Sequence, residues 1–301
     1  MKRQINTLPV PTFRWLKMNG TLLEESVLPQ EVRTVTAAAG TTETVFLTAS
    51  GESQTAAALS ADAASAGYHL ILEKDARLNL IQIITGAGDA PLVQEITADC
   101  GENAQLHVYW IFTGGAAVYP SVTAELTGAG SSFVLDGAYI VRPSETLDMN
   151  IVVNHSGRDT ESRIQVRGVL YDRAKKIFRG TIDFKRGCKG AVGDEREEVL
   201  LMDDEAVNQT VPLILCAEED VAGNHGASIG RIDEEEQFYL ASRGLSPEEI
   251  EEILLAARIR AVVGKMPQEV RGKAEAAAGL SRFGALSEDA EAVGVFRGDR
   301  A

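Results

Sequence analysis

His225 is the side chain in this sequence that is best placed to do chemistry, because small and flexible residues surround it. It lies within the stretch Asp220-Val221-Ala222-Gly223-Asn224-His225-Gly226-Ala227-Ser228-Ile229-Gly230. An imidazole with such flanks is accessible as a metal ligand or as a base. The acidic residues just before it, Glu218, Glu219 and Asp220, either attract a metal cation or are simply solvated. Chemistry alone leaves a functional and a structural role for His225 open.

The remaining histidines and the cysteines fit structural roles. His69 and His107 fall in expected strands, and His155 falls in an expected turn. The three cysteines, Cys100, Cys188 and Cys216, lack CxxC spacing, so neither a disulfide framework nor a structural zinc site is indicated. We predict that each thiol is reduced and is a small core residue. Motifs for phosphate cradling or serine hydrolysis are missing, and we assign no catalytic residue.

The net charge of −15 is carried by one part of the chain. Between Asp194 and Glu252 there are 18 acidic residues and three basic ones, and the rest of the sequence is balanced. Such a segment repels nucleic acids and anionic lipids, so we expect neither as a partner. The start of the chain has no apolar run after Lys2 and Arg3, and no window approaches the roughly 18 apolar residues of a membrane span. A cytoplasmic location is the expectation.

Short strands separated by Gly-rich turns dominate residues 68–184. The strands are rich in β-branched and aromatic residues. Turns of similar composition recur, since Gly101 to Gly128 is 27 positions and Gly130 to Gly157 is also 27. A strand and turn repeat of this length, without intervening helices, favours a β-solenoid in which each rung stacks on the previous one. An antiparallel sandwich is the alternative.

Three helices are expected after the strands. Residues 234–242 fit a short helix that Gly244 ends. Ser246-Pro247-Glu248-Glu249 is a strong helix start, with an N-cap serine, a proline at the first helical position and carboxylates in the first turn. The helix over 246–263 has an apolar stripe, which needs either the end of the solenoid or another protein as its partner. A further Ala-rich helix is expected over 266–279.

Several short motifs follow one another between residues 177 and 263. They are Phe178-Arg179-Gly180-Thr181-Ile182, Leu200-Leu201-Met202-Asp203-Asp204-Glu205-Ala206, Pro212-Leu213, Asp220-Val221, His225-Gly226-Ala227-Ser228-Ile229-Gly230, Phe238-Tyr239-Leu240 and Arg243-Gly244-Leu245-Ser246. In this order they resemble the core of the SufB/SufD family of iron-sulfur cluster assembly scaffold proteins, and its D-type subunits in particular. The likeness is general in the earlier strands and weak at the N-terminus, where many relatives carry a longer helical region that this chain is expected to lack.

The resemblance implies a mainly β fold, with a right-handed parallel β-helix core and C-terminal α-helices. It also implies a non-enzymatic scaffold that docks a SufC-type ABC ATPase through residues 246–263. The β-helix is expected to pair with a B-type, SufB-like subunit or with a second copy of this chain. The expected organisation is a strap over 1–30, a β-helix core over 31–233, a helical ATPase-docking region over 234–280 and a mobile tail over 281–301.

The resemblance makes His225 the candidate metal ligand, for iron or a transient iron-sulfur cluster at a subunit interface, with no cofactor required for folding. The place of the sulfur-accepting cysteine of B-type subunits is taken here by Glu197. The B-type glutamate that follows the histidine is replaced by Gly226, and the Lys-Cys-Ser of many D-type relatives is replaced by Ala222-Gly223-Asn224. Cys216 is either a substitute thiol or a buried structural residue.

Two other functions stay open at this point. Carbohydrate-active enzymes, the polysaccharide lyases and hydrolases, also use β-solenoids with carboxylate pairs. Here the carboxylates gather toward the C-terminal end, and aromatic residues for sugar stacking make up only 6% of the chain. A β-helix that serves only as a structural docking module is the other alternative, and it differs from the assembly scaffold in whether His225 binds iron.

Overall fold

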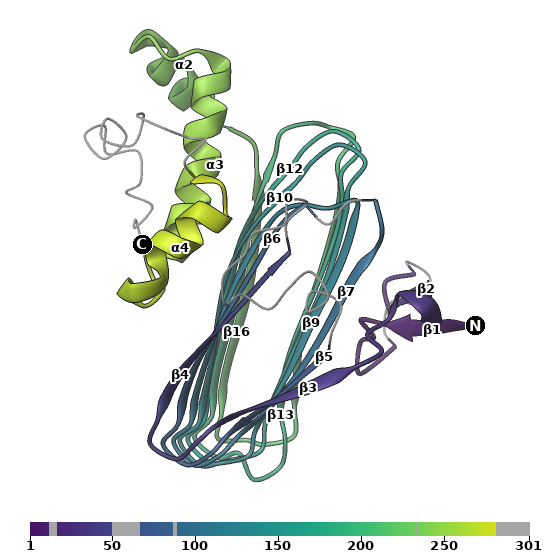
Figure 1. Ribbon diagram of the computed structural model, residues 1–301, viewed down its shortest axis with the longest axis vertical. Helices are drawn as coiled ribbons and strands as arrows, with labels where there is room; N and C mark the ends of the chain where they lie inside the picture. The colour runs from purple at the N-terminus through teal and green to yellow at the C-terminus, as the bar shows by residue number, and fades with distance from the viewer. Residues whose placement is uncertain (12–16, 50–66, 87–88, 233, 281–301) are drawn as a thin grey trace.

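The computed structural model describes residues 1–11, 17–49, 67–86, 89–232 and 234–280, and it shows a stack of strands flanked by helices (Figure 1). Two parallel sheets have seven strands each. The odd sheet contains β3 (Val32–Ala37), β5 (Gly67–Leu72), β7 (Leu92–Cys100), β9 (Ala117–Leu126), β11 (Thr146–His155), β13 (Lys175–Phe184) and β15 (Val207–Cys216). The even sheet contains β4 (Thr42–Ala49), β6 (Arg77–Thr85), β8 (Gln105–Gly114), β10 (Ser132–Val141), β12 (Glu161–Leu170), β14 (Val192–Leu201) and β16 (Ala222–Gly230).

Each turn of the chain adds one strand to each sheet, so the fold is a parallel β-solenoid. In the even sheet, for example, Gln105, Ser132, Glu161 and Val192 are successive register partners at the starts of four neighbouring strands. The chain therefore returns to the same place after 27 to 31 residues, as the spacing of the Gly-rich turns predicts. The parallel pairing confirms the solenoid and rules out the antiparallel sandwich.

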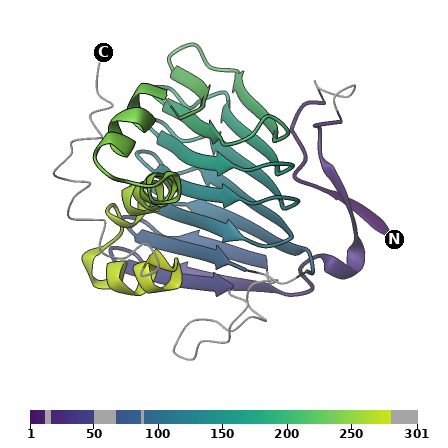
Figure 2. The same cartoon turned by 90° about the horizontal axis from the view of Figure 1, so that it is seen from above.

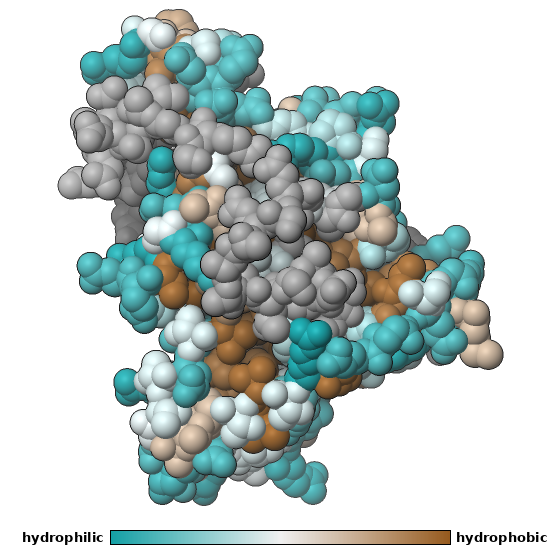
Figure 3. Space-filling model, in the orientation of Figure 1, coloured by the Kyte–Doolittle hydropathy of each residue, from teal (hydrophilic) through white to brown (hydrophobic). Residues whose placement is uncertain are grey.

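Alternate residues of each strand point into the space between the two sheets, which we call the lumen. Side chains of register partners lie on the same face, so each inward position forms a column along the stack. One such column in the even sheet is fully buried and apolar over four rungs: Leu80, Val108, Leu135 and Ile164. Apolar patches between the two sheets are visible on the face of the molecule drawn in Figure 3. These columns form the hydrophobic core of the solenoid.

Glycines of three successive turns stack closely at one corner of the solenoid. The amide of Gly101 donates to the carbonyl of Leu72, and the amides of Gly128 and Gly157 donate to carbonyls of the rung before. A Cβ at Gly128 would lie 2.0 Å from the carbonyl carbon of Gly101, and a Cβ at Gly157 would lie 2.6 Å from the carbonyl oxygen of Gly128. The recurring glycines are therefore required because each turn rests directly on the backbone of its neighbour.

Of the C-terminal helices, the second and third cover the outer face of the even sheet, and the first packs against the second (Figure 2). In chain order the helices are α2 (Glu234–Ser242), α3 (Pro247–Val263) and α4 (Gln268–Ala277). The apolar stripe of α3, which includes Ile250, Leu254 and Ile259, packs in one buried cluster with Ile111 and Ile140 of the even sheet. The partner of this stripe is thus the side of the solenoid, and neither its end nor another protein covers it. Outward-facing apolar residues on several rungs are the physical reason.

Two polar features fix α3 and its connection to α4. Ser246 caps α3 by accepting from the amide of Glu249, whose carboxylate accepts from the amide of Ser246, as the sequence predicts. After α3, the Nζ atom of Lys265 lies 2.5 Å from Oδ1 of the buried Asp136. Oδ2 of Asp136 lies 2.8 Å from Nε2 of His107. The helical region is therefore anchored to the solenoid by charge as well as by apolar packing.

The N-terminal residues lie against the outer face of the odd sheet. Their antiparallel strands β1 (Lys2–Ile5) and β2 (Thr21–Glu24) precede a short 3-10 helix, η1 (Glu25–Val27). Asn6 donates to the buried carboxylate of Asp148, which also forms an ion pair with the buried Arg179. The predicted tail over 281–301 lies outside the described residues. Among the described helices, none is long and apolar enough to cross a membrane.

Candidate functional site at the open end of the solenoid

His225 lies on β16, the last strand of the even sheet, and its side chain is exposed. Among the described strands β16 pairs only with β14, so its other edge is free. The expected flexible flanks are instead an extended strand, which the hydrogen bonds to β14 impose. In register His225 follows Glu195, which follows Ile164 in the apolar column described above. The imidazole therefore occupies a lumen-facing position at the open end of the stack.

The column below His225 changes from apolar to ionisable at Glu195. This glutamate is only 2% exposed, and its Oε2 atom has no hydrogen-bond partner. Burial, followed by the nearby carboxylates of Glu197 and Asp194, raises the pKa of Glu195 to about 8. Gly180 of the facing sheet makes room for it, since a Cβ there would lie 2.3 Å from the carboxyl carbon of Glu195. The last complete rung thus holds an uncharged carboxyl group with a free oxygen.

Glu197 occupies the next lumen-facing position on β14 and has several partners. The Nζ atom of Lys176 lies 2.6 Å from Oε1 of Glu197, and both side chains are buried. Tyr139 donates to the same oxygen at 2.9 Å, and Thr210 donates to Oε2 at 2.6 Å. Burial lowers the pKa of Lys176, while Glu197 opposes that shift. Glu197, the residue that the family resemblance aligns with the sulfur-accepting cysteine of B-type subunits, is therefore one half of a buried ion pair.

Cys216 lies in the same last rung but not beside His225 in register. It is the final residue of β15 in the odd sheet, where it pairs with Phe184. His225 lies on β16 in the even sheet and pairs with Glu195. The thiol is exposed and donates to the carbonyl of Glu218. The prediction of a buried thiol is wrong for Cys216, because no described rung covers β15. It is confirmed for Cys100 and Cys188, and burial raises the pKa of Cys100 to about 12.

The acidic residues before His225 do not gather around it as a metal site. The carboxylate of Glu218 accepts from the amides of Gly187 and Glu219, which lowers its pKa. Within the described part of the chain, no group of three or more His, Cys, Asp or Glu side chains could hold a metal ion. Any cation at His225 would therefore need ligands other than Glu218, Glu219 and Asp220.

The other histidines have local polar partners. His69 lies near Thr97 and Asp99, and His107 contacts Asp136. His155 is the last residue of β11 and not part of a turn. It is fully buried between the hydroxyls of Thr160 and Ser162, and burial lowers its pKa to about 4.

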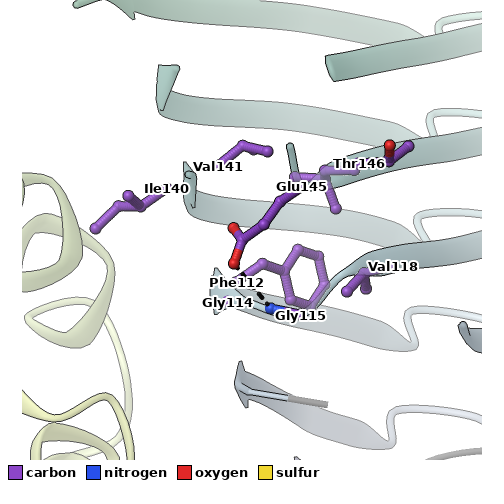
Figure 4. Close-up of a pocket in the computed structure, with 9 residues that line it drawn as sticks. Phe112, Gly114, Gly115, Val118, Ile140, Val141, Glu145 and Thr146 are labelled. Atoms are coloured by element: carbon purple, nitrogen blue, oxygen red, sulfur yellow. Dashed lines mark hydrogen bonds between the residues drawn. The ribbon is translucent and has the colours of Figure 1, made fainter. Parts of the chain in front are cut away.

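A small pocket lies well away from His225, between the turns that join β8 to β9 and β10 to β11 (Figure 4). Phe112, Val118 and Ile140 line it, with Glu145 as its only ionisable group. The carboxylate of Glu145 accepts from the backbone amides of Arg142 and Gly115. The Glu145 carboxylate therefore stabilises a turn, and this pocket is a weaker candidate for a functional site than the open end of the solenoid.

Glu195 should make stability depend on pH in a recognisable way. Its pKa in the fold is about 8, above the ordinary value of 4.5. The contribution of the protonated carboxyl to the free energy of unfolding is therefore fully present below pH 4.5 and is lost as the pH rises through 8. Glu195→Gln removes this loss. The difference in unfolding free energy between the variant and the wild type should shift in favour of the variant by on the order of 4 kcal/mol from pH 5 to pH 8.5. Urea unfolding at both pH values measures this gain.

Glu198→Gln is the matched control for that experiment, because Glu198 lies on the same strand but on its outer, solvated face, paired with Arg167. Its effect should be the same at both pH values. A Glu195→Gln variant whose stability difference from the wild type does not change with pH would show that the carboxyl is already ionised in the fold.

Sequence patterns could have pointed to Glu195 and Lys176, which the sequence-based prediction missed. Val199 and Leu201 share the inward face of β14 with Glu195 and Glu197. The alternation of side chains along the strand therefore places both carboxylates in the lumen. The acidic character of the segment hid this, since charged runs usually lie on solvated faces.

Comparison with known proteins assigns most of the chain to one family. The family model described as "SUF system FeS cluster assembly, SufBD core domain" matches residues 30–258. The chain is 31% identical over 147 residues to the iron-sulfur cluster assembly protein SufD of Bacillus subtilis, covering 49% of this chain and 34% of that protein. It is 25% identical over 207 residues to an iron-sulfur cluster assembly SufBD family protein of Staphylococcus epidermidis, covering 68% of this chain and 44% of the relative.

The chain thus spans less than half the length of each of these relatives. The matched region contains nearly all of the described solenoid, including His225, and most of α3. Because the family model matches well over half of the chain, the protein belongs to the SufB/SufD family of iron-sulfur cluster assembly proteins and is SufD-like.

Proposed function

We propose that this chain is a non-enzymatic scaffold subunit of a Suf-type iron-sulfur cluster assembly complex, with His225 as a ligand for the iron that it handles. The observation that carries this proposal is the position of His225 at the open end of the solenoid, above a lumen that becomes polar in its last rungs. Membership of the SufB/SufD family favours this function over a carbohydrate-active enzyme.

The open end is the surface proposed for pairing. Every residue of β16 is exposed, and no described strand pairs with the backbone amides and carbonyls along its outer edge. Ile229 is 56% exposed, and Val207 at the start of β15 is 44% exposed. A strand edge of this kind is prone to aggregation unless another strand covers it. A SufB-like subunit or a second copy of this chain would supply that strand.

Iron at this interface would be cargo shared between subunits. The chain itself offers the imidazole of His225, and imidazole nitrogen is a common ligand for iron. The family's cysteine and glutamate positions are filled here by Glu197 and Gly226, and Cys216 lies elsewhere in the rung. Most of the ligands for a cluster would therefore come from the partner subunit.

The ATPase is proposed to bind the helical region on the outer face of the even sheet. The apolar stripe of α3 is used by the solenoid, so residues 246–263 can contact an ATPase only through their outer, polar face. The neighbouring α2 adds exposed aromatic surface, since Phe238 is 77% exposed and Tyr239 lies beside it. The docking surface is thus the outer side of α2 and α3 together.

Affinity purification of the tagged full chain from its own cells tests this function. The expected result is copurification of an ABC-type ATPase and of either a SufB-like subunit or a second, untagged copy of the chain. Phe238→Ser should weaken retention of the ATPase and leave the pairing intact. A chain that retains neither partner, but binds or cleaves a polysaccharide in a parallel screen, would overturn the proposal.

A further inference from the structure

Glu195 is a buried ionisable residue with an oxygen that has no hydrogen-bond partner. Buried polar atoms in proteins are nearly always hydrogen-bonded, and an exception calls for an explanation. Its Oε2 atom has no partner, while Lys176, a buried cation on the facing strand, is bound by Glu197 and Thr210. The site is also built around the carboxyl group, because any side chain at Gly180 would collide with it. The surroundings therefore accommodate a carboxyl group at this position, although its Oε2 atom forms no hydrogen bond that would stabilise the fold.

The free oxygen lies one strand away from the proposed iron ligand. Glu195 and His225 are register partners on neighbouring parallel strands, so their side chains project from the same face of the even sheet. Neighbouring strands are about 4.8 Å apart. Metal-to-ligand bonds of imidazole nitrogen and carboxylate oxygen are each about 2.1 Å long, as known for zinc. The strand spacing therefore allows one cation to be shared without a change in the backbone, once the carboxyl group of Glu195, which lies against Gly180, turns toward His225.

We propose that Glu195 is a second ligand, whose Oε2 atom joins the imidazole of His225 in binding divalent iron at the open end of the solenoid. The proposal rests on the function proposed above for His225. The pair has one nitrogen and one oxygen donor, which suits a first-row divalent cation. It also explains why the lumen column becomes ionisable in the rung below His225: the ionised form of the carboxyl adds the negative charge that a neutral imidazole lacks.

The pair leaves most of the coordination shell to water or to the partner subunit. The site on this chain should therefore bind and release iron readily, as handling of a cargo requires.

Anaerobic titration of the purified full chain with ferrous iron tests the proposal. Wild type should bind ferrous iron, and Glu195→Gln should weaken its affinity about tenfold or more. His225→Ala should weaken it at least as much, while the control Glu198→Gln should bind as the wild type does. Cobalt(II) in place of iron gives a second measurement, because loss of an oxygen ligand shifts its visible absorption spectrum.

The possible outcomes separate this proposal from the one on which it rests. Wild-type affinity and cobalt spectrum in Glu195→Gln, together with weakened binding in His225→Ala, would reject Glu195 as a ligand and keep His225. Unchanged binding in His225→Ala, or no binding by the wild type, would reject both. Glu195→Asp keeps the carboxylate but shortens it, so it should fall between wild type and Glu195→Gln if folding is intact.

Discussion

Gly128→Ala is expected to destabilise the protein by about 3 kcal/mol or more. The added Cβ would lie 2.0 Å from the carbonyl carbon of Gly101 and 2.1 Å from the amide nitrogen of Glu102. Both atoms belong to the backbone of the turn below, so no side-chain rotation relieves the collision. Because Gly157 rests on Gly128 from the other side, the whole corner of the stack must shift. Chemical denaturation of the variant and the wild type measures the loss.

Gly272→Ala is the matched control for this experiment. Gly272 lies in α4 and has no atom within 4 Å of the place where a Cβ would be added. Alanine is favoured over glycine inside a helix by up to about 1 kcal/mol, so the control should be neutral or stabilising. Similar destabilisation by the two substitutions would show that the glycine column does not determine the stacking of the rungs.

Lys176→Met is expected to destabilise the fold by about 3 to 5 kcal/mol. The lysine is fully buried, and its ammonium group is the cation paired with the buried carboxylate of Glu197. Methionine fills similar space but leaves that carboxylate without a counter-charge in the lumen. An uncompensated buried charge costs more free energy than the pair contributes, so the single variant should be far less stable than one without either charge.

The double variant Lys176→Met with Glu197→Gln provides the test of that cause. Glutamine is neutral, and its oxygen still accepts from Tyr139, which donates to Glu197 in the wild type at 2.9 Å. The double variant should recover most of the stability lost in Lys176→Met. If it is as unstable as the single variant, the loss comes from packing and not from the unpaired carboxylate. Equilibrium unfolding of the three proteins at one pH makes the comparison.

The solenoid could be predicted from the sequence because its geometry imposes a repeat on the turns. Glycines such as Gly101 and Gly128 recur at the spacing of one rung, and short strands rich in β-branched and aromatic residues lie between them. The cap of α3 at Ser246 was equally predictable, since a capping box is local in sequence. Features set by contacts within a few residues, or by a repeat of nearly constant length, can be predicted from one sequence.

The properties of the last rung could not be predicted in the same way. β16 is rich in glycine, alanine and serine, which have little preference for strands, and pairing with β14 imposes its extended form. Cys216 is exposed because no described rung follows β15, although its sequence neighbours are apolar. The covering of the α3 stripe by the even sheet also depends on contacts between distant parts of the chain. In each case, the outcome depends on which element lies next to the residue in space.

The candidate site was predicted in part. The motif that contains His225 pointed to the residue, but the sequence-based prediction did not show that a buried glutamate lies directly below it. Glu195 and Glu197 stand two residues apart on one strand, and only the stacking of rungs gives them different roles. One carboxyl is held in an ion pair with Lys176, and the other has a free oxygen.

Maturation of iron-sulfur enzymes in cells that depend on this protein is the most direct test of the central claim. The activity of one such enzyme is measured in a deletion strain that carries the wild-type gene, His225→Ala or Ser228→Ala. Ser228 lies on the same exposed strand but on the opposite face, so it controls for changes to β16 itself. Abundance of each variant and its retention of the proposed ATPase partner are measured in parallel. We expect Ser228→Ala to restore activity as the wild type does, and His225→Ala to remain at the level of the deletion strain. Full enzyme activity with His225→Ala would contradict the account.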